Sequence, residues 1–204
     1  MGMSVKISEF LIATVIVRNR VLARRYNLCR LLFLLLLLPA QIQSQFTYET
    51  NNGTITITGY TGSGGDVTVP ESISGLPVTS IGSSAFNNNS SVTSLILPES
   101  ITRIGELAFA YCSNLTSVDL TENVASVGNS AFLFCTRMTN ISFGGGLTNI
   151  GEAAFWNCES LSSINLPSSL SSVGSYAFGR CTNLVSITTP QGVAYIGPYA
   201  FSDC

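Results

Sequence analysis

The chain has 204 residues, of which 46% are hydrophobic and only 10% charged, and its formal net charge is −2. Apolar residues recur at regular intervals, which excludes an intrinsically disordered chain. Residues 45–204 hold three arginines against ten acidic residues. They cannot neutralise many phosphates, so no nucleic acid is expected among the partners.

Residues 1–44 have the layout of a secretory signal peptide. A basic region with five arginines precedes the apolar run of residues 31–38, and Pro39, Ala40 and a polar stretch follow. The run is much shorter than the roughly 20 residues that cross a membrane, so no stable span is expected in the mature chain. A membrane anchor is the alternative. The long basic region also indicates an over-extended N-terminus, with a translation start at Val21.

Residues 45–66 are predicted to form a capping β-hairpin and a loop. Apolar and polar residues alternate on both sides of Asn52-Gly53, a dipeptide suited to the positive φ angles of a tight hairpin turn. Phe46 and Tyr48 should share a face with Ile55 and Ile57. A hairpin here would cover the apolar edge that the first turn of a repeat stack otherwise shows to water.

Residues 67–204 are built on one repeated phrase, with a period of about 23 residues that does not change between its copies. In the second copy the phrase reads Ile104-Gly105-Glu106-Leu107-Ala108-Phe109-Ala110-Tyr111-Cys112. A half unit (67–80) precedes five full units (81–195), and a truncated unit (196–204) follows. An invariant period predicts stacked, equivalent turns of chain. The break within the sixth unit predicts that the chain is a fragment of a longer protein or that its gene is truncated.

Each unit should form one turn of a solenoid. In the fourth unit, Ile164 and Leu166 alternate with polar residues, which predicts a short strand with one buried face that Pro167 ends. A second extended piece and a tight or helical turn at Gly174 should complete the turn. Strands of successive turns should pair in a parallel sheet. The phenylalanines of the phrase should stack as a spine, comprising Phe86, Phe109, Phe132, Phe155, Phe178 and Phe201.

The pattern I-G-x-x-A-F-x-x-C-x-x-L-x-S-I-x-L-P closely resembles the BspA-type leucine-rich repeat of bacterial and protist surface proteins. The resemblance covers residues 67–204 and extends to a lead-in at residues 75–78. It implies an α/β-type solenoid: a leucine-rich repeat stack with a parallel β-sheet, mostly β and irregular structure, capped by the N-terminal β-hairpin. Thr121 and Gly144 replace the proline, and Phe143 and Thr189 replace the leucine, so local irregularity is expected there.

The cysteines recur at one position of the repeat. Stacked Cβ atoms about 4.8 Å apart lie outside the usual disulfide range, so we expect a column of small buried residues and a more oxidisable Cys204. The column comprises Cys112, Cys135, Cys158 and Cys181. A disulfide framework is the alternative. The chain has no histidine, so no Ser-His or Cys-His nucleophile can be built, and because it also has no closely spaced cysteine pairs no zinc site is expected. No metal, cofactor or enzymatic activity is expected.

Two sets of residues are candidates for partner binding. The first lies between the phenylalanine and the cysteine, where the sequence varies: Tyr111, Leu133, Phe134 and Trp156 would form an apolar patch over adjacent turns. The alternative is that they cover the edge of the core. The second set is on the outer face of the strands, with Asp119, Asn140 and Asn165 among small polar residues. An ordinary solvated sheet is the alternative there.

These patterns predict a secreted or surface-displayed, non-catalytic binding protein that recognises a protein or a glycan. The resemblance implies adhesion or contact with a host or matrix. Two alternatives remain open, both depending on sequence beyond Cys204. The repeats would be a structural spacer for a lost domain, or the non-catalytic part of a larger secreted enzyme.

Overall fold

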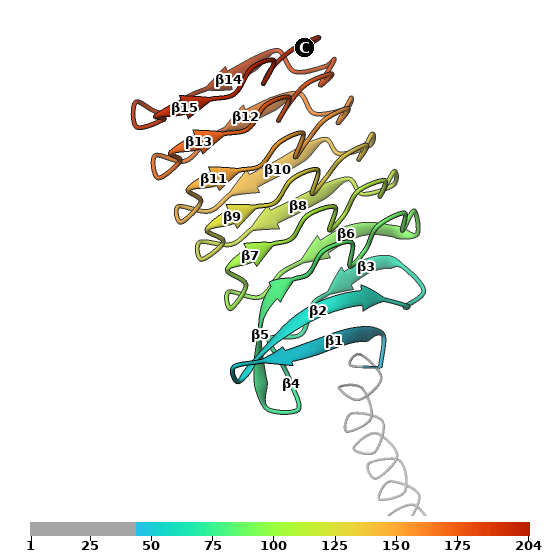
Figure 1. Ribbon diagram of the computed structural model, residues 1–204. Helices are drawn as coiled ribbons and strands as arrows, with labels where there is room; N and C mark the ends of the chain where they lie inside the picture. Colours follow the sequence, from blue (N-terminus) through green and yellow to red (C-terminus); the bar gives the residue numbers. More distant parts are fainter. Residues whose placement is uncertain (1–43) are drawn as a thin grey trace, which may run out of the picture. The chain divides into compact units, whose positions relative to one another are not determined.

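The computed structural model describes residues 44–204, and the signal peptide expected over residues 1–44 lies outside that range except for Ser44. The described chain is a stack of turns that repeat every 23 residues, as the sequence predicts (Figure 1). No helix occurs within residues 44–204, so of the two forms expected at Gly174 the structure has the tight turn. In the same range no segment is a helix long and apolar enough to span a membrane.

The N-terminal hairpin consists of β1 (Phe46–Asn51) and β2 (Thr54–Tyr60), joined at Asn52-Gly53. Both turn residues have positive φ, 49° and 77°, as a tight hairpin requires. The rings of Phe46 and Tyr60 pack on Phe86 of the first full unit, at 6.4 and 5.2 Å between centroids. The hairpin therefore covers the N-terminal end of the aromatic spine.

Tyr48 lies opposite Ile57 in the hairpin, as the predicted shared face requires, yet it stays 39% exposed. Because β1 is the terminal strand of its sheet, no further strand covers its ring.

Each full turn contributes two strands, where the sequence pattern predicted one strand and a second extended piece. The longer strands are β3 (Gly65–Thr68), β6 (Val92–Ile96), β8 (Ser117–Leu120), β10 (Asn140–Phe143), β12 (Ser163–Asn165) and β14 (Ser186–Thr188). They form one parallel run, β3-β6-β8-β10, and a separate pair, β12-β14. The hydrogen-bond ladder is interrupted after β10, beside Phe143 and Gly144, where the sequence departs from the repeat.

A second, continuous sheet contains the two-residue strands that follow the corner of each turn, where the repeat has a proline or, at Thr121 and Gly144, its replacement. They are β7 (Arg103–Ile104), β9 (Ser126–Val127), β11 (Asn149–Ile150), β13 (Ser172–Val173) and β15 (Tyr195–Ile196). The sheet begins at the hairpin and β5 (Leu76–Ile81), on which β4 (Ser72–Ile73) folds back antiparallel. The sequence predicted this second extended piece of each turn, but it did not predict that the pieces of successive turns pair in a continuous sheet.

The core is continuous and is filled by the side chains that recur in every unit. Successive rings from Phe86 to Phe201 lie 4.9 to 5.6 Å apart, with planes tilted by 4° to 26°. Phe109, Phe132, Phe155 and Phe178 have no exposed surface. Fully burying a phenylalanine contributes about 1.5–3 kcal/mol, so the spine is a major source of stability.

Candidate functional site

The third side of each turn is the segment that contains the repeated phrase. Its amide groups alternate between two kinds of partner. In the second unit, the amides of Ala108, Ala110 and Cys112 donate to carbonyl oxygens three residues earlier, within the turn. Those of Leu107, Phe109 and Tyr111 donate to the following turn, at 2.7 to 3.0 Å. This side therefore joins neighbouring turns without being a strand.

Two residues of each segment have positive φ, and none of them is the glycine. In the second unit they are Leu107, with φ of 55°, and Tyr111, with 61°. Glycine occupies its own position for a different reason: a Cβ on Gly128 would lie 2.7 Å from Gly105 and Glu106 backbone atoms. The glycine column thus permits close packing of turns, and L-residues with side chains take the left-handed conformation instead.

The structure brings three of the predicted binding residues into one row. Tyr111 stacks on Phe134 with centroids 5.2 Å apart and planes 10° apart, and Phe134 meets Trp156 edge to face at 5.0 Å. Tyr111 is 43% exposed, whereas Phe134 and Trp156 are half-buried. We call these three residues the aromatic row. It both covers the core edge and reaches the surface, and its part in partner binding stays a prediction.

The fourth predicted residue, Leu133, is half-buried at the repeat position that Trp156 occupies one turn later. Trp156 leans over the next turn because Gly179 has no side chain there: a Cβ on Gly179 would lie 2.8 Å from Cδ1 of the indole. The guanidinium carbon of Arg180 lies 5.5 Å from the Trp156 ring centroid, a cation–π contact.

A second exposed aromatic pair lies on the same side of the stack and was missed by the sequence reasoning. Tyr176 and Tyr199 stack at 5.0 Å and are 40% and 64% exposed. Both occupy the first left-handed position of their segments. Their spacing of one full repeat was the signal that would have revealed the pair.

The predicted polar residues lie on the outer face of the longer strands, Asp119 on β8, Asn140 on β10 and Asn165 on β12, and all three are exposed. Asp119 accepts a hydrogen bond from Ser142, whereas Asn165 lies beyond the interruption after β10. These residues are on the strands and the aromatic row is on the turn segments. The two predicted sets therefore lie on different sides of the turn.

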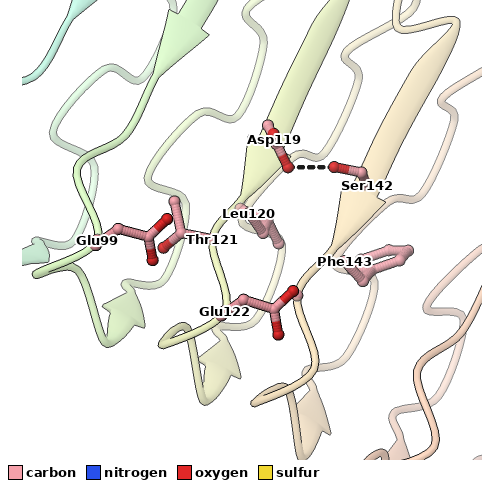
Figure 2. Close-up of a pocket in the computed structure, with 8 residues that line it drawn as sticks. Glu99, Asp119, Leu120, Thr121, Glu122, Ser142 and Phe143 are labelled. Carbon is pink, nitrogen blue, oxygen red and sulfur yellow. Dashed lines mark hydrogen bonds between the residues drawn. The ribbon is translucent and has the colours of Figure 1, made fainter.

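A cavity of about 320 Å³ lies at the end of β8 and β10 (Figure 2). It occurs where Thr121 and Gly144 replace the proline of the repeat, and the carboxylates of Glu99, Asp119 and Glu122 line it. Glu122 accepts a 2.6 Å hydrogen bond from the Gly145 amide. Within residues 44–204, no group of three potential ligands is placed to hold a metal ion. The cavity thus reflects the irregularity expected at these two positions.

The cysteine column is buried, and its members form no disulfide: Cys112, Cys135, Cys158 and Cys181. Burial raises the pKa of Cys112 and of Cys181 to about 12 and that of the two between them well above the ordinary value. Cys204 is also free but exposed. The buried thiols stay protonated at neutral pH and are poor nucleophiles.

Comparison with known proteins identifies the repeat. The family model of the BspA type leucine-rich repeat region matches residues 79–204 in six copies. A crystal structure of a leucine-rich repeat protein from T. pallidum is 28% identical, with a TM-score of 0.68 over 76% of this chain and 84% of that one. No curated protein matches the chain.

A leucine-rich cell surface protein from Faecalibacterium prausnitzii is 31% identical, with a TM-score of 0.69 over 78% of this chain. The chain spans about half of that protein, 51% of its length. A leucine-rich repeat protein from Eubacterium ventriosum, 20% identical with a TM-score of 0.58 over 78% of this chain and 50% of that one, shares the fold.

Proposed function

The chain belongs to the BspA-type leucine-rich repeat family, and from that premise we propose that it is a secreted or surface-displayed binding protein without catalytic activity. The family supports a binding role based on the repeats, and one similar protein is described as a cell surface protein. The signal peptide expected over residues 1–44 supports export. Adhesion to a protein or glycan of another cell or matrix is the activity we propose for this surface.

The aromatic row is the observation that carries the proposal. Tyr111, Phe134 and Trp156 come from three adjacent turns and touch one another while part of each ring remains accessible. Aromatic side chains are enriched among the residues that dominate binding energy at protein interfaces. Stacking along the solenoid also immobilises the rings before a partner arrives, which lowers the entropy cost of binding.

A second feature of the row is that two of its rings lie at left-handed backbone positions. Tyr111 and Phe134 have φ of 61° and 57°, a conformation that bulky L-residues rarely adopt. The equivalent residues of other units include Asn88 and Asn157, which tolerate it better. Because this position is left-handed in every unit, the bulky rings there, and not the conformation itself, set the row apart.

Binding of the full-length chain to purified matrix proteins and to a glycan array tests the proposal. The variant combines Phe134→Ser with Trp156→Ala, and the control combines Tyr48→Ser with Val185→Ser, which change exposed side chains outside the row. The aromatic-row variant should bind about 30-fold more weakly, as for a loss of about 2 kcal/mol at a hot spot, and the control should bind like the wild type. Equal affinities of wild type and a folded aromatic-row variant would contradict the proposal.

A further inference from the structure

The orientation of the rings restricts what the aromatic row can bind. Tyr111 and Phe134 are equivalent residues of adjacent turns, and their planes are 10° apart at 5.2 Å. Their facing surfaces are therefore covered by each other, and what remains accessible in the middle of the row is mainly ring edge. Neutral sugars bind aromatic residues through C–H groups laid on an open ring face, which carries the negative charge of the quadrupole. The two facing surfaces of Tyr111 and Phe134 offer no such platform.

Trp156 is the member of the row whose ring is nearly perpendicular to its neighbour. The angle between the planes of Trp156 and Phe134 is 79°, so the faces of the indole point across the stack of turns and not along it. Arg180 covers one of these faces, with its guanidinium carbon 5.5 Å from the centroid. Gly179 is on the same turn as Arg180, and because it has no side chain it leaves room there for the indole of Trp156. A sugar could stack on this face only by displacing Arg180.

The guanidinium of Arg180 has unused hydrogen-bond donors. The side chain is exposed, and within residues 44–204 the cation–π contact is the one interaction that its guanidinium makes. Asp203 occupies the equivalent position one turn later but makes no ion pair with it in that range. A guanidinium that makes a cation–π contact and no hydrogen bond keeps its N–H groups available in the fork geometry that matches a carboxylate.

We propose that the aromatic row and Arg180 together recognise a protein segment that presents an apolar side chain beside a carboxylate. The segment's apolar side chain packs on the ring edges of Tyr111 and Phe134. Its carboxylate accepts two hydrogen bonds from Arg180, which thereby determines specificity. This inference rests on the proposed binding function and names the partner's chemistry. Residues 45–204 hold ten acidic residues against three arginines, which disfavours a highly acidic partner, so one or two carboxylates are the expected number.

The single tryptophan of the chain makes the test specific, because tryptophan emission reports on Trp156 alone. The full-length chain is titrated with the peptide acetyl-Asp-Leu-Phe-Asp-amide, its neutral isostere acetyl-Asn-Leu-Phe-Asn-amide and cellopentaose. The acidic peptide should change Trp156 emission and bind at least about tenfold more tightly than the isostere, as expected for a charge-assisted bidentate contact. Arg180→Gln should abolish that preference, and Arg180→Lys should restore only part of it.

Arg137→Gln is the matched control, since Arg137 is also exposed and contacts no ring in the described residues. It should leave the preference unchanged. Equal binding of the two peptides, an unchanged preference in Arg180→Gln, or tighter binding of cellopentaose would each overturn the inference. The proposed function fails separately, if the variant with Phe134→Ser and Trp156→Ala keeps its affinity for the matrix proteins and glycans.

Discussion

The thiol of Cys158 donates a hydrogen bond to the carbonyl oxygen of Phe132 in the preceding turn, at 3.3 Å between sulfur and oxygen. The same contact recurs from Cys112 to Phe86 and from Cys181 to Phe155, at 3.1 and 3.3 Å. The Phe132 carbonyl also accepts from the Cys135 amide of its own turn. The cysteine column is therefore a polar ladder inside the core that bonds each turn to the one before it.

Replacing Cys158 with alanine removes this bond and leaves a small void in a fully buried position. We expect the free energy of unfolding to fall by about 1–2 kcal/mol, measured by urea denaturation. Cys204→Ala is the comparison, because the Cys204 thiol makes the same bond, to the Phe178 carbonyl at 3.1 Å, but is exposed at the end of the described stack, so its removal should cost less. Equal losses for the two variants would show that the buried thiol contributes nothing specific.

The cysteine column also predicts a loss of stability in alkali. Below about pH 9, the ordinary thiol pKa, folded and unfolded thiols are both protonated, so the column causes no pH dependence. Between that value and the folded pKa of about 12 for Cys112 and Cys181, the unfolded thiols ionise first and unfolding becomes easier. Each thiol should lower the free energy of unfolding by up to about 1.4 kcal/mol per pH unit in this range.

Urea titrations on both sides of pH 9 measure this decrease. The variant with Cys112 and Cys181 both changed to alanine should show a shallower fall in the free energy of unfolding than the wild type. Parallel pH profiles for the two proteins would show that these thiols do not cause the loss.

Removing a ring from the spine should be costly in the middle of the stack and cheaper at its end. Phe155 has no exposed surface and stacks on both neighbours, so Phe155→Ala should lower the free energy of unfolding by about 3–5 kcal/mol. Phe201 is half-buried and stacks on Phe178 alone among the spine residues, so Phe201→Ala should cost less than half as much. Thermal denaturation followed by circular dichroism compares them, and similar losses would argue against a stacked spine.

Adding a side chain in the glycine column should destabilise the fold, whereas removing a side chain at a positive-φ position should stabilise it. A Cβ on Gly151 would meet the Asn129 amide nitrogen at 2.6 Å, so Gly151→Ala should destabilise the fold by about 1–3 kcal/mol. Ser130 has φ of 52°, so Ser130→Gly relieves an unfavourable conformation and should stabilise it by up to about 1 kcal/mol. Urea denaturation of both variants is the measurement, and a stabilising Gly151→Ala would refute the close-packing explanation.

The stack, the spine and the buried cysteine column could all be predicted from the amino-acid sequence. A strict period places equivalent residues one above another, and the repeated apolar positions then have to fill one continuous core. The same argument assigned Phe155 and Cys158 to the interior without any coordinates. It works because these contacts are made between identical positions of adjacent turns.

The contacts that cross from one repeat position to another became apparent only in the folded chain. Trp156 belongs to the column of Leu133, yet it meets Phe134 and lies under Arg180 because Gly179 leaves space on the next turn. The pairing of the short strands in a second sheet likewise depends on backbone directions that two-residue segments do not encode. Periodicity specifies which residues stack, whereas the orientation of a side chain depends on the space that its neighbours leave, and that space is known only once the turns are packed.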